Sequence, residues 1–336
     1  GLGDPIGISA KNLMNLGDLL DDTVKHFPPV GTNVDDEDTI HVAVIGRPNV
    51  GKSSILNTLL GQKVAIVSSK PQTTRTRIMG VLTEGGTQLV FTDTPGLHKP
   101  RNSLDKFMVR SVSESVAGVD ACLLVTEAGR EVSPEELELV EKFKALDIPA
   151  VLAINKTDTL KDKTILAGQI AKLSKLYDFE AVVPCSAQTN DGIDDLKNEL
   201  KALAMEGMHF FDDDTLTDQP ERVLAAEIIR EKMLRLLAKE VPHGSAVVVE
   251  RMREREDSNI TDIDATVYCE KASHKGIIIG KGGSMLKKIG SYARADMEKF
   301  FGCKINLTIW VKVKEDWRNR EGILRSLGYD ERNFDN

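Results

Sequence analysis

The sequence predicts a two-domain protein: a doubly wound α/β domain with a parallel-rich sheet, followed by a smaller α+β domain. Three observations support this fold class. The chain has 336 residues, more than a single hydrophobic core usually serves. Between residues 40 and 205, short apolar runs alternate with helical patterns, which is typical of a parallel sheet covered by helices on both faces. After residue 221, the order becomes helix, strand, strand, helix, helix, strand.

Six apolar runs are the candidate strands of the first domain. They are residues 40–45, 78–82, 88–92, 121–125, 150–154 and 181–184. In such sheets, ligands bind beyond the carboxyl ends of the strands. The polar motifs of this domain follow such ends, so we expect them to meet in space.

Composition narrows the class of protein. A hydrophobic fraction of 41% and a charged fraction of 29% are typical of a globular protein, and a net charge of −8 argues against nucleic-acid binding by the whole surface. Neither a membrane-spanning run nor a secretion signal is evident. We therefore expect a cytoplasmic protein, with peripheral contact at the inner face of the cell membrane left open. A monomer is the expected oligomeric state, although no sequence feature determines it. The four cysteines, Cys122, Cys185, Cys269 and Cys303, are far apart and are expected to be reduced thiols.

A glycine-rich loop follows the first run. Gly46-Arg47-Pro48-Asn49-Val50-Gly51-Lys52-Ser53 lies between an apolar strand and a helical pattern, the setting that a phosphate-binding loop (P-loop) requires. Its backbone N–H groups and the helix N-terminus would surround phosphate, and Lys52 would reach the β- and γ-phosphates. The expected nucleotide contacts here are Asn49, Val50, Gly51, Lys52, Ser53 and Ser54.

Two further segments supply groups for Mg²⁺ and the γ-phosphate. Asp93-Thr94-Pro95-Gly96 follows the third run, so that Asp93 would support Mg²⁺ and the Gly96 N–H would face the γ-phosphate. The polar segment 68–76 lies where a switch loop is expected, and we favour Thr74 over Thr73 as its magnesium ligand. The expected Mg²⁺ set is Ser53, Thr74 and Asp93.

Asn155-Lys156-Thr157-Asp158 follows the fifth run and predicts the base. The Asp158 carboxylate can accept from guanine N1–H and N2–H₂, whereas adenine has no such donor pair. Asn155 and Lys156 would brace the P-loop and cover the ring. Ser186-Ala187 follows the sixth run and would direct backbone N–H groups to guanine O6. GTP is therefore the predicted nucleotide.

The second domain carries a Gly-Lys-Gly-Gly loop between two helical patterns, the arrangement of a type II KH domain, which clamps single-stranded RNA. From Lys271 to Arg294 there are six cations and no acidic residue. Solvated helix lysines are the alternative interpretation. The expected RNA-binding residues are Lys275, Gly280, Lys281, Gly282, Gly283, Lys287 and Lys288.

Taken together, these motifs resemble the Era GTPases. The resemblance covers residues 40–325 and is most specific in Lys70-Pro71-Gln72-Thr73-Thr74-Arg75 and in Leu97-His98-Lys99-Pro100. It implies GTP hydrolysis, Mg²⁺ as cofactor, binding to the 3′ end of 16S rRNA, and a role in assembly of the 30S subunit. The domains expected are a GTP-binding G domain (39–205), a linker (206–220), the KH domain (221–325) and a C-terminal tail (326–336).

Leu97 stands where Ras-like enzymes have a water-orienting glutamine, so slow hydrolysis is expected. Related GTPases with asparagine at the position of Asn49 can hold K⁺ beside the phosphates, and K⁺ is a further candidate cofactor here. Asn49, Lys52 and Thr74 are the expected catalytic residues. The alternative is a GTP-dependent switch with negligible intrinsic hydrolysis.

Residues 1–38 are a separate N-terminal extension with an acidic linker at its end. Ser9-Ala10 and Asp18-Leu19 repeat the spacing of Ser186-Ala187 and Asp195-Leu196. The extension thus resembles the end of a GTPase domain of the tandem-GTPase EngA family. A second alternative follows: an EngA-type fragment that acts on the large subunit. An unrelated extension is the remaining interpretation.

Overall fold

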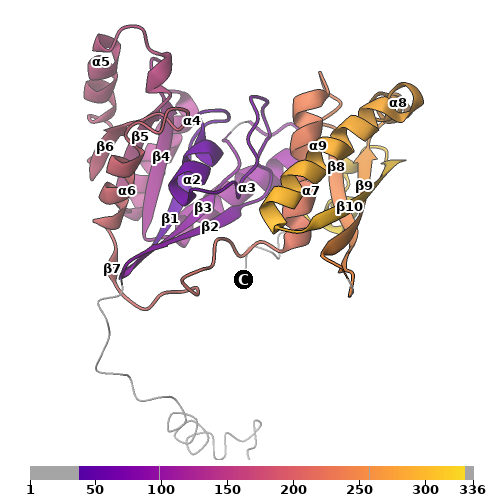
Figure 1. Ribbon diagram of the computed structural model, residues 1–336. Coiled ribbons are helices and arrows are strands. Elements are labelled where there is room, and N and C mark those ends of the chain that lie inside the picture. The colour runs from indigo at the N-terminus through magenta and orange to yellow at the C-terminus, as the bar shows by residue number, and fades with distance from the viewer. Residues whose placement is uncertain (1–37, 98, 257, 330–336) are drawn as a thin grey trace, which may run out of the picture. The chain divides into compact units, whose positions relative to one another are not determined.

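The computed structural model describes residues 38–97, 99–256 and 258–329, and Figure 1 labels their helices and strands. The EngA-like segment within residues 1–37 lies outside the described residues, as does the end of the C-terminal tail.

The first domain is built on a seven-stranded sheet. The order is β2-β3-β1-β4-β5-β6, and β7 pairs with the start of β1. Its strands are β1 (Asp38–Ile45), β2 (Ile78–Glu84), β3 (Thr87–Asp93), β4 (Ala121–Glu127), β5 (Ala150–Asn155), β6 (Ala181–Pro184) and β7 (Met205–Glu206). The central strands are parallel, as the alternation of apolar runs predicts. The carboxyl ends of β1, β3, β4 and β5 therefore lie at one edge.

Two strands depart from a purely parallel sheet. β2 is antiparallel to β3, and β7 is antiparallel to β1. Only Gly85 and Gly86 connect β2 to β3, a link far too short for a parallel crossover. The Gly85 φ of 63° gives this turn the left-handed backbone that favours glycine.

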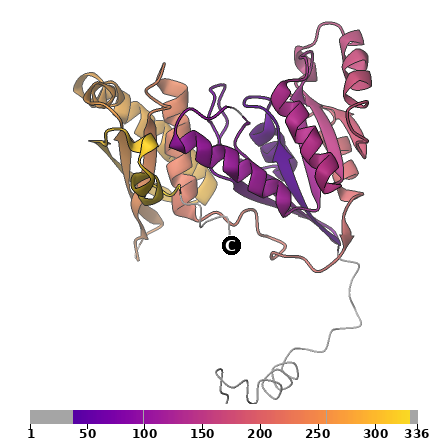
Figure 2. The same ribbon diagram turned by 180° about the vertical axis from the view of Figure 1, so that it is seen from behind.

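Helices cover both faces of this sheet and form two cores. On one face lie α2 (Lys52–Leu60) and α6 (Ile193–Lys201), visible in front of the sheet in Figure 1. The other face carries α3 (Ser103–Ala117), α4 (Pro134–Leu146) and α5 (Thr164–Leu173), and Figure 2 is seen from this side. Two-sided burial explains why β4 and β5 are almost entirely apolar.

The segment expected to be a linker, 206–220, lies against the first sheet. The N–H groups of Phe210 and Phe211 donate to Gln88 Oε1 at 2.9 and 3.1 Å, and Val81 N–H donates to Leu216 O at 2.9 Å. Thr217 Oγ1 donates to Met79 O. This connection is therefore held along the sheet before α7 begins.

The second domain has the predicted order of elements. They are α7 (Glu221–Leu236), β8 (Ser245–Glu254), β9 (Ile260–Cys269), α8 (Ala272–Ile279), α9 (Ser284–Phe301) and β10 (Lys304–Val313). The sheet order is β10-β9-β8, with β9 parallel to β10 and antiparallel to β8. Alternate residues of β9, Ile263, Ala265 and Val267, face the helices and are fully buried.

The C-terminal elements η3 (Trp317–Asn319) and α10 (Glu321–Ser326) connect the two domains. Trp317, Leu324 and Tyr329 form one apolar cluster with Leu104 and Met108 of α3. The cluster also contains Ala246 and Tyr268 on the face of the second sheet that turns away from α7 and α9. One apolar cluster thus joins α3 to the KH sheet.

All four cysteines are free thiols. Burial raises the pKa of Cys122 to about 12, so this thiol is unreactive. None of the described helices is both long enough and apolar enough to span a bilayer.

Candidate functional site

The loop between β1 and α2 has a backbone that only glycine fits. Gly51 has a φ of 101°, and a Cβ there would lie 2.1 Å from Asn155 Nδ2. Gly46 has a φ of 150°, and its Cβ would lie 2.3 Å from Val125 O. Asn155 also donates from Nδ2 to Val50 O at 2.8 Å. The end of β5 therefore braces the loop, as the sequence predicts for Asn155.

Lys52 is buried at the first turn of α2. Its Nζ donates to Gly46 O at 3.1 Å and to Arg47 O at 3.2 Å, inside the curve of the loop. Burial lowers the pKa of Lys52 to about 8, although the charge of Asp93 opposes the shift. An ammonium group with so few anionic neighbours is well suited to bind phosphate.

The structure brings the three expected magnesium residues together. Ser53 Oγ donates to Asp93 Oδ2 at 2.5 Å, Thr74 Oγ1 donates to the same atom at 3.3 Å, and the two hydroxyl oxygens are 3.1 Å apart. Thr73 Oγ1 turns away and donates to Lys70 O at 2.7 Å.

Asp93 supplies a test of whether these residues fit Mg²⁺. Its side chain is completely buried, and Oδ1 has no hydrogen-bond partner among the described residues. Burial raises the pKa of Asp93, against the opposing charge of Lys52. A buried carboxylate oxygen without a partner, beside two hydroxyls, suits a small cation that takes few protein ligands. Among the described residues, no group of three or more His, Cys, Asp or Glu side chains is arranged to hold a metal ion.

A cavity of about 610 Å³ extends over the loop and the switch segment. Gly96 closes one side, where a Cβ would lie 2.6 Å from Pro48 Cα. Asn49 closes another side, since its Nδ2 donates to Ser69 O at 3.0 Å. The expected site residues that line this cavity are Asn49, Gly51, Lys52, Ser53, Ser54, Thr74, Gly96 and Lys156. Gln72, Glu127, Arg130 and Gln188 also line it and were not predicted.

Of the residues expected to contact the base, Lys156 lines this cavity, whereas Asn155, Asp158, Ser186 and Ala187 do not. Asp158 Oδ1 accepts from Ser186 Oγ at 2.6 Å, and Lys156 Nζ donates to Asn49 O at 2.6 Å. The backbone N–H groups expected to face guanine O6 are both engaged within the protein. Ser186 N–H donates to Asp191 O at 2.8 Å, and Ala187 N–H donates to Asn155 Oδ1 at 3.1 Å.

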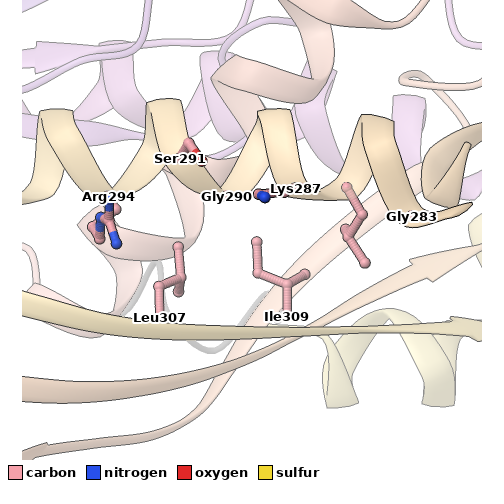
Figure 3. A pocket seen from close by; sticks show the side chains of 8 residues that line it. Gly283, Lys287, Gly290, Ser291, Arg294, Leu307 and Ile309 are labelled. Carbon is pink, nitrogen blue, oxygen red and sulfur yellow. The ribbon is translucent and has the colours of Figure 1, made fainter.

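The second domain has a groove between α9 and the edge strand β10, shown in Figure 3. Its volume is about 440 Å³. The loop at one end, η2 (Lys281–Gly283), has φ values of 74°, 58° and 79° at Gly280, Gly282 and Gly283, which favour glycine. The groove is lined by Gly283, Leu286, Lys287, Gly290, Ser291, Arg294, Leu307 and Ile309.

Two of the expected RNA-binding residues, Gly283 and Lys287, line this groove. Lys275, Gly280, Lys281, Gly282 and Lys288 do not, and Lys288 Nζ lies 5.8 Å from the ring centre of Tyr292. Arg294, Leu307 and Ile309 were not predicted. The strict alternation of apolar residues in the last strand was the signal that could have placed Leu307 and Ile309 on the helix side.

Residues 70–75, within the expected switch segment 68–76, also hold the KH domain. Lys70 Nζ donates to the carbonyl oxygens of Leu234 and Leu237 at the end of α7. Arg230 of α7 donates to the carbonyl oxygens of Gln72 and Thr73. No sequence pattern indicates these contacts, because the acceptors are main-chain oxygens.

Comparison with known proteins agrees with this geometry. Residues 41–156 match the family model described as a 50S ribosome-binding GTPase, and residues 240–318 match the KH domain. "GTPase Era" of Ruminiclostridium cellulolyticum is 52% identical over 288 residues, covering 86% of this chain and 96% of that protein. The chain belongs to the Era GTPase family. "GTPase Era" of Clostridioides difficile is 45% identical over 295 residues, covering 87% of this chain and 98% of that protein.

Solved structures of Era extend the match to both domains. A variant of Aquifex aeolicus Era bound to GDP·AlF4⁻ has a TM-score of 0.84 and 36% identity, covering 87% of this chain and 99% of that chain. The structure of Era with MgGDPNP and nucleotides 1506–1542 of 16S ribosomal RNA gives the same values. This protein is therefore an Era-type GTPase with a KH domain, and the expected fold class is confirmed. The two described domains are not a fragment of EngA.

Proposed function

We propose that this Era GTPase uses GTP binding and hydrolysis to control the binding of single-stranded RNA at the 3′ end of 16S rRNA, and that it thereby assists assembly of the 30S subunit. One observation carries the coupling. Residues 70–75 bring Thr74 to Asp93 and Ser53 and also contact α7 of the KH domain. The likeness to Era bound to this RNA supports the identity of the partner.

At the nucleotide site, Ser53, Thr74 and Asp93 would hold Mg²⁺, which supplies charge neutralisation at the β- and γ-phosphates. Lys52 would add its positive charge, and the N–H groups of residues 49–54 and of Gly96 would orient the phosphates. Asp158 would select guanine, while Lys156 covers the ring. Ala187 N–H would reach guanine O6 by sharing its hydrogen with Asn155 Oδ1, since Ser186 N–H is held by Asp191.

We infer that Asn49 binds K⁺ beside the phosphates and so compensates for Leu97. The Asn49 side chain already donates a hydrogen bond from the P-loop to the Ser69 carbonyl oxygen. Asn49 Oδ1 and Ser69 O therefore both lie near one wall of the cavity. GTP turnover by wild-type protein should be faster in K⁺ than in Na⁺, and Asn49→Ala should abolish the difference. Equal wild-type rates in both salts would remove K⁺ from the proposal.

The alternative, a switch with negligible hydrolysis, is favoured by Leu97 alone. Single-turnover assays with and without the RNA distinguish the two functions. A chemical step that stays negligible in K⁺ and in the presence of RNA would support the switch.

Glycines of the KH loop provide the sharpest test of RNA binding. Gly282→Asp and Gly283→Asp place a side chain and a negative charge on a left-handed backbone, and both should abolish binding of an oligonucleotide from nucleotides 1506–1542. Gly276→Ala is the matched control, because a Cβ there meets open space within α8. Loss of binding in Gly276→Ala as well would show that the loop effect is not specific.

The remaining expectations concern the oligomeric state and the cellular location of the protein. We propose a cytoplasmic monomer that visits the inner face of the membrane without spanning it. Sedimentation equilibrium tests the first statement, and co-flotation with vesicles of anionic phospholipid tests the second. A stable dimer, or binding that is equal for neutral and anionic vesicles, would contradict them.

A further inference from the structure

Trp310 is an exposed aromatic residue on the edge strand of the KH sheet. Trp310 is 61% exposed, whereas Trp317, the other tryptophan, is completely buried. Ile309 lines the groove of Figure 3, and side chains alternate along a strand. Trp310 therefore lies on the opposite face of β10, directly across the strand from the groove.

The neighbours of Trp310 on this face are polar or cationic. Along β10 they are Thr308 and Lys312, and the Cα partner of Trp310 on β9 is Thr266. Lys312 is exposed and forms no salt bridge with a described residue. Asp264, opposite Thr308, is the acidic group nearest in register. The C-terminal helix covers Tyr268 and Val248 on the same face but leaves Trp310 open.

We propose that RNA leaving the groove crosses the edge of β10 and stacks a base on Trp310, while Lys312 binds a phosphate. This inference rests on the RNA binding proposed above and extends the groove by a second subsite. β10 is an edge strand, so no further strand separates the groove from the Trp310 face. Two cations, Lys287 and Arg294, line the groove itself, and neither forms a salt bridge with a described residue.

The length of RNA supports this subsite. A KH loop clamps about four nucleotides. The RNA in the solved complex of Era spans nucleotides 1506–1542, many times that length. Nucleotides outside the groove need a surface, and an exposed indole beside a lysine is a stacking platform that accepts any base.

A protein partner fits Trp310 less well. Aromatic anchors of protein interfaces are usually surrounded by other contacts that exclude water. Here the nearest neighbours on the face are two threonines and a lysine. Single-stranded RNA needs only an aromatic ring on which a base stacks and a cation that binds a phosphate.

Intrinsic fluorescence of the full chain tests the proposal, because only one of its two tryptophans is exposed. The probes are oligonucleotides from nucleotides 1506–1542, beginning with a tetranucleotide and lengthened one nucleotide at a time. Short pieces should bind without quenching. Quenching of the tryptophan fluorescence should begin only above a defined RNA length. The Trp310→Phe variant should show no such quenching and should still bind the RNA nearly as tightly as wild type.

Affinity provides the second measurement. Trp310→Ala should weaken binding of a twelve-nucleotide RNA by about tenfold, the loss expected for one stacked base, and leave tetranucleotide binding unchanged. Lys312→Ala should lower the salt dependence for the longer RNA only. If the wild-type protein does not bind the tetranucleotide, the proposed function is refuted and not this subsite.

Two results would overturn the subsite. One is equal affinity of wild type and Trp310→Ala for the twelve-nucleotide RNA. The other is unchanged RNA affinity together with lost binding to intact 30S subunits, which would assign the Trp310 face to a ribosomal protein.

Discussion

Arg75 Nη1 donates a hydrogen bond of 2.7 Å to the main-chain oxygen of Ser245, the first residue of β8. Nη2 of the same side chain donates to His243 O at 2.8 Å, and the guanidinium lies 5.8 Å from the ring centre of Trp317. Arg75 is almost completely buried. It directly follows Thr74, so the proposed magnesium ligand and the anchor of the KH sheet are adjacent in the chain.

We predict that Arg75→Lys weakens both stability and coupling. An ammonium group cannot reproduce the two-pronged contact, so the free energy of unfolding should fall by about 3 kcal/mol. The ratio of RNA affinities in the GTP-analogue and GDP states should move toward one, because displacement of Thr74 would no longer pull on β8. Thermal unfolding and RNA titrations in both states measure these effects.

Arg222→Lys is the matched control, since Arg222 is an exposed residue of α7. It should change neither quantity. An Arg75→Lys protein that is destabilised yet keeps the wild-type affinity ratio would show that Arg75 supports the fold without transmitting the nucleotide state.

A second contact between the domains is ionic and predicts acid sensitivity. Glu231 of α7 is completely buried and accepts from Lys63 at 2.6 Å, Lys232 at 2.8 Å and Arg235 at 2.8 Å. Burial alone would raise the pKa of Glu231, but hydrogen bonds from Lys232 and Lys63 outweigh it and hold the pKa below the ordinary value. The unfolded chain therefore binds the proton more readily. This stabilisation is present above the unfolded pKa and is lost as pH falls through the folded pKa.

Glu231→Gln should accordingly lower the free energy of unfolding by about 3–5 kcal/mol at neutral pH, because it leaves buried cations without their carboxylate. The loss of stability of wild type on acidification from about pH 5 should be smaller in this variant. Glu199→Gln, an exposed change on α6, should alter neither value. Parallel pH profiles of wild type and Glu231→Gln would contradict the assignment.

The sequence identifies residues whose role depends only on their position next to a predicted strand or helix. Gly46, Lys52, Asp93 and Asn155 could be placed because each lies at or soon after the carboxyl end of a strand, and parallel strands bring these ends together. The apolar periodicity of the sequence located β9 and α9, because it indicates which face of each element is buried.

Groups whose role depends on how distant segments meet could not be placed. Arg75 and Lys70 donate to main-chain oxygens of the KH domain, and any residue could supply those oxygens. Arg294 faces the groove only because α9 lies along β10. The strand β2 was predicted, but its antiparallel direction was not, because an apolar run has no direction; the Gly85-Gly86 turn carried that information.

Lys52 predicts a pH dependence of nucleotide affinity. Phosphate binding requires the charged ammonium, but the pKa in the free protein is about 8. Above that pH, binding must take up a proton, so the affinity for a GTP analogue should fall roughly tenfold between pH 7 and pH 9. Isothermal titrations across this range measure the slope.

The same pKa sets the sign of the stability change in free protein. An unfolded lysine keeps a pKa of about 10.4, so between the two values the unfolded state binds more protons and the free energy of unfolding rises with pH. Lys52→Arg is the control, because its guanidinium stays protonated throughout. An unchanged pH slope in that variant would assign the titration to another group.

Asp158 predicts an exchange of base specificity. Its Oδ1 accepts from Ser186 Oγ at 2.6 Å, which fixes the plane of the carboxylate. In Asp158→Asn, Oδ1 would keep the Ser186 hydrogen bond, so Nδ2 would take the other position and donate. Guanine offers two donors there, whereas xanthine offers N1–H beside a carbonyl oxygen. GTP turnover should therefore fall by about 10²–10³ and xanthosine triphosphate should become the preferred substrate.

Competition between the two triphosphates in a hydrolysis assay measures this exchange, with ATP as the negative control. Adding Ser186→Ala to the Asp158→Asn variant frees the new amide to rotate, so the preference for xanthosine triphosphate should shrink while overall turnover changes little. If Asp158→Asn instead lowered GTP turnover without raising turnover of xanthosine triphosphate, the side chain would be needed for the structure of the loop and not for recognition of the base. The contact between Asp158 and Ser186 would then be structural, and guanine selection would have to come from the main chain around Ala187.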